Sequence, residues 1–418
     1  MDAEVLVYLD WEGVSVPVGK LWSRARKGKE SATFEYDAKW LENSSRFSLE
    51  PALKVGPGPF HTANGKALFG ALGDSAPDRW GRALMRRAER QDATAENRTP
   101  RTLLEVDYLL RVTDEARQGA LRFATEPGGA FLAPSDRNTI PPLIDLPKLL
   151  SASDKISEDP HADEALRFLL APGSSLGGAR PKASVRDMDG HLAIAKFPRK
   201  EDETDAVLWE AVALKLAGKA GIEVPEFRVE AVAGRNVLVL RRFDRVDGAR
   251  RPFLSAMSLL DARDNEQHSY LEIADGLRQH GARAKDDLRQ LWRRMVFNVL
   301  ISNTDDHLRN HGFLYESMSG WVLSPAYDLN PVPTDIKPRL LSTGIDPDDN
   351  AASLDLALEH AGYFELTDRD AAAIAKEVGA AVSSWRREAS HLGLRSAEID
   401  RMASAFEHDD LKQALAGC

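Results

Sequence analysis

The sequence predicts an α+β fold, with a mixed α/β N-terminal part, a β-containing middle and an all-helical C-terminal lobe. Three observations support this prediction. Apolar and polar residues alternate in short runs near the N-terminus, a strong hairpin signal lies in the middle, and amphipathic helical patterns dominate the C-terminal part. We therefore expect three regions, residues 1–130, 131–245 and 246–418.

The N-terminal region contains a hairpin signal and a pair of helices. "EVLVYLDWEGVSVPVGKLW" alternates around a Glu-Gly turn, which is typical of two antiparallel strands. Residues 66–91 predict helix, turn and helix, with Ser75 or Asp78 as an N-cap. The proline- and glycine-rich text "ATEPGGAFLAPSDRNTIPP" then predicts a boundary.

The middle region combines strands with one helix. "RPKASVRDMDGHLAIAKF" predicts two strands joined at Met188-Asp189-Gly190, because Asp-Gly favours a tight hairpin turn. "TDAVLWEAVALKLAGKAG" predicts an amphipathic helix, capped by Thr204 or Asp205 and closed by Gly221. "RNVLVLRRFDR" predicts a buried strand.

Composition limits the functional classes. The 418 residues are 43% hydrophobic and 29% charged, as in an ordinary globular protein. There is no apolar run of the ~18 residues that a membrane span needs and no basic leader, so we expect a cytoplasmic protein without membrane contact. The single cysteine, Cys418, excludes an intramolecular disulfide and cysteine-based zinc sites. The net charge of −10 does not favour binding to nucleic acid. If the protein acts at DNA, we expect a partner to make most of the DNA contacts.

A glycine-rich stretch, "GSSLGGARPKASV" (173–185), has the small residues that let backbone N–H groups approach phosphate oxygens. Gly173 and Gly178 have the Walker spacing, but the two residues that follow are not the required Lys-Ser/Thr. A glycine-rich loop flanked by strands is instead typical of protein kinases, in which a lysine on a following strand binds the phosphates. Lys196 in "HLAIAKF" is that lysine, and Glu210 on the next helix is its candidate acidic partner. Taken singly, a plain turn and an exposed helix glutamate are the commoner interpretations.

The stretch "NVLISNTDDHLRNHGFLY" follows an apolar helical run. Phosphoryl transfer needs a carboxylate that orients the attacking hydroxyl and oxygen ligands for Mg²⁺. Asp305 and Asn310 have the spacing of the catalytic Asp and the metal-binding Asn in kinase loops, whereas the same step from Asp306 reaches His311, a poor Mg²⁺ ligand. "SPAYDLNP" supplies Asp328 as a second metal ligand, after an expected strand, "GWVLS". Each residue could simply cap a helix or a turn, but the complete kinase order is far more specific.

The sequence resembles the HipA family of bacterial serine/threonine kinases, the toxin halves of HipA/HipB-type toxin–antitoxin pairs. The resemblance covers nearly the whole chain. "LGDSAPDRWGRALMRR" and "GALRF" resemble the N-terminal region of the family, "SSLGGARPKA" its phosphate loop, and "NTDDHLRNHGF" with "PAYDLNP" its catalytic and metal segments. It departs at Arg180-Pro181, where some members carry Gln-Glu. The resemblance implies a two-lobe, protein-kinase-like fold, ATP, Mg²⁺ and phosphoryl transfer to a serine or threonine of a protein.

The resemblance also implies a role for each site residue. Ser175 matches a loop serine that is autophosphorylated in the family, with the adjacent Ser174 as the alternative; a phosphate there would compete with ATP or expel the loop. The implied residues are Asp305 as catalytic base, His307 as organiser of its loop, Asn310 and Asp328 as Mg²⁺ ligands, and Ser174, Ser175, Gly177, Gly178, Ala179, Lys182, Lys196 and Glu210 at the ATP site.

The partners that the resemblance implies are a small HipB-like helix-turn-helix antitoxin, operator DNA bound mainly through that antitoxin, and a protein substrate, with an aminoacyl-tRNA synthetase as the first candidate. Three alternatives remain. A phosphoinositide-kinase-like lipid or small-molecule kinase has the same loop spacing, but a lipid kinase needs a basic membrane-facing patch. A metal-dependent phosphohydrolase using Asp305, Asp306, His307 and His311 leaves Lys196 unexplained. A catalytically inactive subunit that only bridges antitoxin and DNA does not need the complete kinase set.

Overall fold

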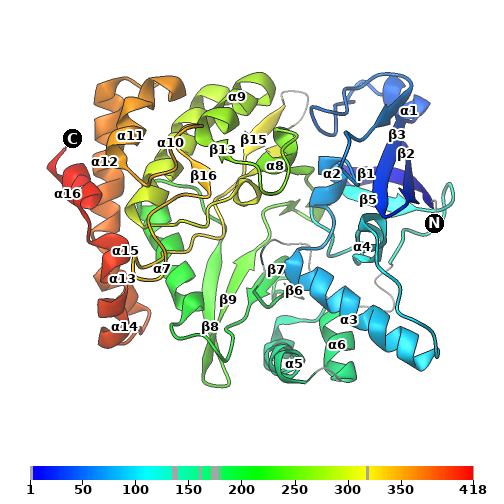
Figure 1. Ribbon diagram of the computed structural model, residues 1–418, viewed down its shortest axis with the longest axis horizontal. Coiled ribbons are helices and arrows are strands. Elements are labelled where there is room, and N and C mark those ends of the chain that lie inside the picture. The colour runs from blue at the N-terminus through cyan, green and yellow to red at the C-terminus, as the bar shows by residue number, and fades with distance from the viewer. Residues whose placement is uncertain are drawn as a thin grey trace. The chain divides into compact units, whose positions relative to one another are not determined.

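The computed structural model describes residues 3–133, 140–159, 162–170, 178, 180–316 and 320–417 (Figure 1). The chain forms two compact units, the first made of Met1–Lys200 and Glu230–Leu254, the second of Glu201–Val229 and Ser255–Cys418. The predicted α+β fold class is confirmed. The division into three regions that the sequence predicts does not correspond to these two units, and it stays a prediction. None of the helices in the described ranges has the length and apolarity needed to cross a membrane.

The first unit contains two sheets and the helices that cover them. Two strands, β8 (Phe227–Val232) and β12 (Phe253–Ser255), span its boundaries with the second unit. Its other elements are β1 (Ala3–Trp11), β2 (Val14–Arg26), β3 (Lys29–Tyr36), α1 (Ala38–Glu42), β4 (Pro59–His61), α2 (Gly70–Asp74), α3 (Arg79–Ala95), α4 (Glu105–Arg111), β5 (Leu121–Ala124), η1 (Leu143–Asp145), α5 (Leu146–Glu158), α6 (Asp163–Leu170), β6 (Lys182–Arg186), β7 (Leu192–Lys196), β9 (Arg235–Arg241), β10 (Arg245–Val246) and β11 (Ala249–Arg250).

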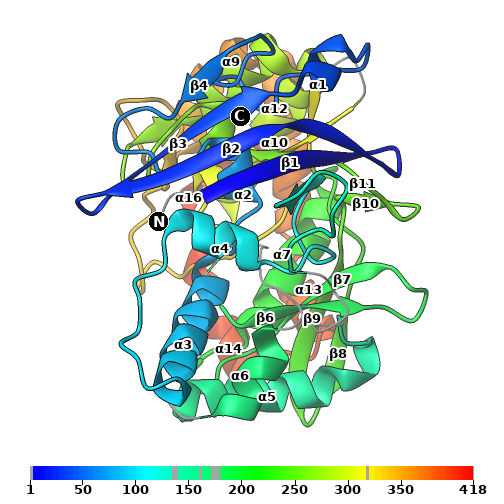
Figure 2. The same ribbon diagram turned by 90° about the vertical axis from the view of Figure 1, so that its right-hand side faces the viewer.

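The N-terminal sheet has the strand order β4-β3-β2-β1-β5, and its three long strands run side by side in Figure 2. The predicted hairpin is confirmed as β1 and β2. Its turn residues Glu12 and Gly13 have φ of 51° and 80°, the left-handed values that a two-residue hairpin turn requires. Val5, Val7 and Leu9 of β1 are buried, as the alternation of the sequence predicts.

The second sheet carries the predicted ATP-site strands. β6 pairs with β7, and β7 with β9, in antiparallel register, and Gly190 turns the first hairpin with φ of 85°. Helices α3, α5 and α6 supply apolar side chains to the same core as these strands. Asp78 is the N-cap of α3, because its carboxylate accepts the Gly81 N–H at 2.8 Å.

One detail of the glycine-rich loop needs correction. We expected strands on both sides, but the element before the loop is the helix α6, and only β6 after it is a strand. The segment "DEALRFLL" has apolar residues at helical spacing, and Leu166 and Leu169 pack into the core.

A buried ion cluster joins the N-terminal sheet region to the segment after β9. Asp244 binds Arg242 at 2.6 Å and Arg245 at 2.7 Å, and it accepts the Gly119 N–H at 2.8 Å. Burial alone would raise the pKa of Asp244, but the two guanidinium groups hold that pKa well below its usual range. The aspartate is therefore ionised in the folded protein at every physiological pH.

We expect Asp244→Asn to lower the free energy of unfolding by about 3 kcal/mol at pH 7, because it leaves two buried arginines without their anion. The folded pKa of Asp244 is below its unfolded value, so this stabilisation is complete at neutral pH and is lost as the pH falls from about 4 toward the folded pKa. Urea unfolding at pH 7 and pH 3 should show the difference between variant and wild type shrinking in acid. Glu158→Gln, which removes an exposed pair with Lys200, is the control, and an equal effect of both variants would contradict the prediction.

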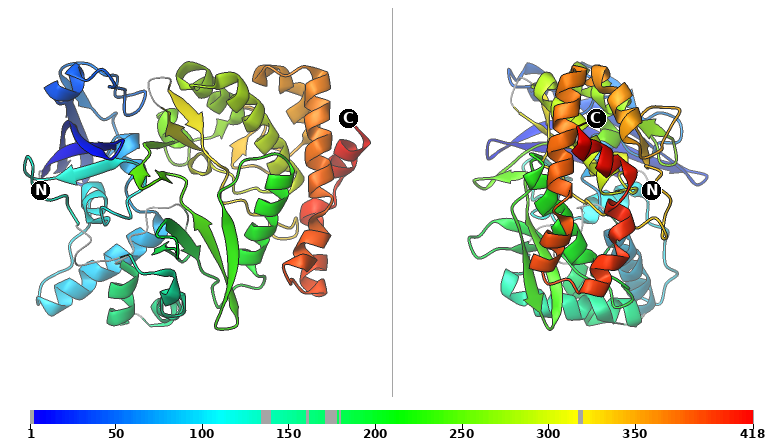
Figure 3. Two further views of the ribbon diagram at one scale, coloured as in Figure 1. Left: turned by 180° about the vertical axis from the view of Figure 1, so that it is seen from behind. Right: turned by 90° about the vertical axis from the view of Figure 1, so that its left-hand side faces the viewer.

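The second unit is built around α10 (Ala284–Leu300), whose residues Trp292, Met295 and Phe297 are fully buried. Two of its helices, α12 (Asp368–Val382) and α16 (Asp409–Ala416), lie side by side in Figure 3 and pack against each other. Its elements are α7 (Ala206–Lys219), α8 (Ala256–Leu259), β13 (His268–Ser269), α9 (Tyr270–His280), α10 (Ala284–Leu300), η2 (Leu308–Asn310), β14 (Gly312–Tyr315), β15 (Trp321–Leu323), β16 (Thr343–Gly344), α11 (Leu354–Glu359), η4 (Ala361–Phe364), α12 (Asp368–Val382), α13 (Trp385–His391), α14 (Ser396–Arg401), α15 (Ala403–Phe406) and α16 (Asp409–Ala416).

The predicted helix in "TDAVLWEAVALKLAGKAG" is α7, with Asp205 as N-cap and Gly221 at φ of 74° beyond its end. The C-terminal part is not all-helical, however. β14 and β15 form an antiparallel hairpin that includes the expected strand "GWVLS", and β13 pairs with β16 in parallel. These strands are too short and too close to turns to give a helical pattern, yet they border the catalytic segment.

Candidate active site

The catalytic segment begins where α10 ends, in a Schellman motif. The Asn303 N–H donates to the Asn298 carbonyl at 2.9 Å, and the Ser302 N–H donates to the Val299 carbonyl at 3.2 Å. Ser302 has φ of 52°, although glycine is the usual residue there. Its hydroxyl donates to the Ala405 carbonyl at 2.8 Å, so contacts with the rest of the unit hold this strained residue in place.

The structure brings Asp305, His307 and Asn310 together within one loop, and their catalytic and metal-binding roles stay predictions. The Asn310 side-chain N–H donates to the Asp305 carbonyl at 3.1 Å, and the His307 N–H donates to the same oxygen at 3.0 Å. These bonds fix the asparagine against the aspartate. The Asn310 amide oxygen keeps its acceptor capacity, as a metal ligand requires.

The Asp305 carboxylate is exposed. No described residue donates a hydrogen bond to this carboxylate or forms an ion pair with it. The Nδ1 atom of His307 is buried and has no hydrogen-bond partner within the described part of the chain. Most buried polar atoms in proteins have a hydrogen-bond partner, so this nitrogen is available to a ligand or a water molecule. An exposed carboxylate beside an unsatisfied imidazole is well placed to meet a polar substrate.

Asp306 and His311, to which the kinase interpretation assigned no role, form a buried pair within the loop. Nε2 of His311 lies 2.9 Å from the Asp306 carboxylate, and the Tyr270 hydroxyl donates to the same carboxylate. Asn298 in turn donates to the Tyr270 hydroxyl at 2.9 Å. Burial alone would raise the pKa of Asp306, but His311 and Tyr270 lower it below its usual value, so the carboxylate is ionised. Thr343 of β16 donates its N–H to the Asp306 carbonyl at 3.1 Å.

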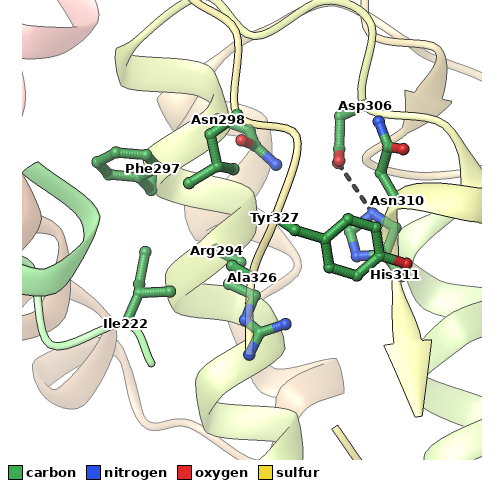
Figure 4. A pocket seen from close by; sticks show the side chains of 10 residues that line it. Ile222, Arg294, Phe297, Asn298, Asp306, Asn310, His311, Ala326 and Tyr327 are labelled. Atoms are coloured by element: carbon green, nitrogen blue, oxygen red, sulfur yellow. Dashed lines mark hydrogen bonds and ion pairs between the residues drawn. The ribbon is translucent and has the colours of Figure 1, made fainter. Parts of the chain in front are cut away.

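A small cavity, with space for about one water molecule, lies under this loop (Figure 4). Arg294 and Phe297 come to it from α10, Asp306 and His311 from the loop, and Tyr327 from the segment before Asp328. Burial lowers the pKa of Arg294 to about 10, so this arginine stays cationic at neutral pH. Its charge is opposite to that of the ionised Asp306 across the same cavity.

The second predicted metal ligand, Asp328, has φ of 58°, a left-handed conformation that is uncommon for residues other than glycine. Asn330 donates to its carbonyl at 3.1 Å, and the preceding Tyr327 donates its hydroxyl to the Arg309 carbonyl at 2.8 Å. The latter bond ties the Asp328 segment to the catalytic loop. Strain of this kind persists at sites whose surroundings hold it, which is typical of functional residues.

The chemistry of the donor set fits Mg²⁺. An amide oxygen from Asn310 and a carboxylate from Asp328 are the hard oxygen ligands that Mg²⁺ prefers, and Mg²⁺ commonly takes its remaining ligands from water and phosphates. Three clustered His, Cys, Asp or Glu side chains, as zinc would need, do not occur in the described ranges. Asp306 and His311 bond to each other, which disfavours the phosphohydrolase alternative.

The predicted ATP-site residues of the first unit lie on or before β6 and β7. Lys182 and Lys196 are directly opposite each other in the register and both are buried. The Lys182 ammonium pairs with the Asp78 carboxylate at 3.0 Å, a contact that the sequence did not reveal. Its phosphate contact stays a prediction.

Other ATP-site predictions remain open. Gly178 has φ of 88°, which suits a tight loop, but Ser174, Ser175, Gly177 and Ala179 lie outside the described residues. Glu210 is buried in α7 of the second unit, whereas Lys196 belongs to the first. The Lys196–Glu210 pair therefore stays a prediction.

Comparison with known proteins places this site in a family. Residues 174–385 match the HipA-like C-terminal domain, and residues 11–106 match the HipA N-terminal domain. The chain belongs to the HipA family. The C-terminal match contains Asp305, Asn310 and Asp328, so these residues lie within the domain that defines the family.

Relatives and a solved structure extend the match. A Haemophilus influenzae protein named "Putative kinase" is 30% identical over 196 residues, which are 41% of this chain and 57% of that relative. The Sinorhizobium fredii protein "Putative kinase Y4mE" is 24% identical over 87% of this chain and 85% of its own length. HipA from Shewanella oneidensis, solved with HipB and operator DNA, superposes with a TM-score of 0.67 at 17% identity and covers 99% of this chain and 96% of its own. This last likeness confirms the expected HipA-type fold.

Proposed function

We propose that this chain is a Mg²⁺-dependent serine/threonine protein kinase that uses ATP. The observation that carries the proposal is the exposed Asp305 carboxylate, with Asn310 fixed against its backbone at 3.1 Å. A kinase loop needs a base that can receive a substrate hydroxyl, with a metal ligand held beside it. The family match and the relatives named as kinases support the same proposal.

In the proposed reaction the Asp305 carboxylate accepts the proton of a serine or threonine hydroxyl. The hydroxyl oxygen forms a bond to the γ-phosphorus of ATP while the bond from that phosphorus to the β,γ-bridging oxygen breaks, and ADP leaves with the electron pair. Asn310 and Asp328 would hold Mg²⁺, which supplies charge neutralisation at the phosphates. Lys196 would bind the phosphates, with Glu210 as its partner.

We expect purified protein to label itself with γ-labelled ATP and Mg²⁺, and Ser175→Ala to lose most of the label while keeping activity on a protein substrate. Ser175 matches the loop serine that is autophosphorylated in the family, and a phosphate at this position would compete with ATP. Ser174→Ala is the matched control and should keep its label. Mass spectrometry that locates the phosphate at Ser174 or outside the loop would contradict the Ser175 assignment.

The biological role that we propose is that of a toxin in a HipA/HipB-type pair in the cytoplasm, controlled by a small helix-turn-helix antitoxin that makes most of the operator contacts. The Shewanella oneidensis structure is a complex of HipA with HipB and operator DNA, and the net charge of −10 agrees with a minor DNA role for this chain. An aminoacyl-tRNA synthetase is the proposed substrate. Phosphoproteomics of cells that express wild type or Asp305→Ala identifies the substrate directly, and a set of phosphosites without a synthetase would refute that choice.

A further inference from the structure

Cationic side chains stabilise the charge on a transferring phosphoryl group, in addition to the metal. The catalytic loop itself supplies no lysine: residues 303–311 contain one arginine, Arg309, which pairs with Asp264 at 2.5 Å on the exposed side. His311 is occupied by Asp306. Besides Lys196, the proposed phosphate-binding lysine, a further cation for this site must therefore come from a segment outside the loop.

Lys337 reaches the loop from the segment between Asp328 and β16. Its ammonium donates to the Thr304 carbonyl at 3.2 Å, and Thr304 directly precedes Asp305. The side chain is half-buried, and no described carboxylate lies within ion-pair distance of it. An ammonium has three N–H donors, so two remain after the bond to Thr304.

We infer that Lys337 is a further catalytic residue, which donates hydrogen bonds to the γ-phosphoryl group as it moves from ATP to the hydroxyl held by Asp305. The inference rests on the proposed kinase function. The Lys337 ammonium is hydrogen-bonded to the carbonyl of the Thr304–Asp305 peptide, and the Asp305 carboxylate is covalently linked to the same peptide. Backbone and side-chain dimensions therefore keep the ammonium within about 10 Å of the carboxylate. This upper limit is compatible with a substrate hydroxyl and one phosphoryl group lying between the ammonium and the carboxylate.

The competing explanation is a structural clamp on the Thr304 carbonyl. Ser342 already serves this carbonyl twice, through its hydroxyl at 2.8 Å and its N–H at 3.2 Å. The carbonyl is therefore satisfied without Lys337, and a charged group is not needed there for hydrogen bonding alone. Ser342→Ala measures the value of the clamp, because it removes one bond to the same oxygen and leaves the charge unchanged.

The test compares steady-state kinetics of four variants on one peptide substrate. We expect Lys337→Ala to lower kcat by about 10²- to 10³-fold, with the KM for ATP within about threefold of wild type, because the contact forms in the transition state. Lys337→Arg should keep part of the rate. Ser342→Ala should lose less than about fivefold, since it breaks one neutral hydrogen bond. Lys285→Ala, an exposed lysine at the start of α10, is the control for loss of a positive charge.

Chemical rescue separates charge from packing. In a Cys418→Ser background, Lys337→Cys should be inactive, and alkylation with 2-bromoethylamine should restore kcat by rebuilding an ammonium of nearly the same length. Thermal unfolding midpoints of all variants should stay close to wild type. Equal losses for Lys337→Ala and Ser342→Ala, or no rescue, would overturn the inference while wild-type activity upheld the kinase. An inactive wild type would instead refute the kinase function and the Lys337 role together.

Discussion

Asp305→Ala should lower kcat for phosphoryl transfer by about 10²- to 10⁴-fold, the usual contribution of a general base. The carboxylate is exposed and unbonded within the described part of the chain, while the loop is held by backbone carbonyls and by Asn310. The substitution therefore removes the proton acceptor and leaves the fold intact. The measurement is kcat with labelled ATP, together with the thermal unfolding midpoint.

The matched control for this variant is Asp348→Ala. Asp348 is an equally exposed aspartate of the same unit, and its carboxylate makes no hydrogen bond or ion pair to the described residues. It should keep wild-type kcat. Asp305→Ala with unchanged kcat would contradict the base assignment, and a large fall in its unfolding midpoint would show that Asp305 acts through the fold instead.

The sequence predicted those features of the fold that depend on a few neighbouring residues. The turn at Glu12-Gly13, the cap at Asp78 and the cap at Asp205 each depend on the conformational preference or side chain of one residue, and each is present. The spacing of Asp305 and Asn310 also works locally, because the bond between them spans a single loop. Signals of this kind are contained within a few positions of sequence.

Contacts between distant segments carried no such signal. Tyr270 meets Asp306 because β13 pairs with β16, and the two residues are 36 positions apart. Lys337 is 33 positions from Thr304, and Lys182 meets Asp78 across separate elements. The sequence contained one usable hint. Asp305 and Asp306 are adjacent and only Asp305 has the kinase spacing, so Asp306 needed a separate explanation.

The buried Asp306 pair leads to the second large prediction. Asp306→Ala should lower the free energy of unfolding by about 3–5 kcal/mol, because it leaves the buried Tyr270 hydroxyl and His311 ring without their shared acceptor. Urea unfolding followed by circular dichroism at pH 7 measures the loss. The arginine of the same loop gives a matched control, since Asp264→Ala breaks the exposed Arg309 pair and should cost no more than about 1 kcal/mol.

A double-mutant cycle tests whether the network acts as one unit. Tyr270→Phe alone removes the donor to Asp306, but in the Asp306→Ala background its hydroxyl has already lost that acceptor, so the second substitution should cost less than the first. Additive losses would show that Tyr270 and Asp306 contribute independently. A coupled loss, in which kcat decreases together with the free energy of unfolding, would show that the buried network stabilises the segment that carries Asp305 and Asn310. The residues of that network would then support catalysis without contacting the substrate.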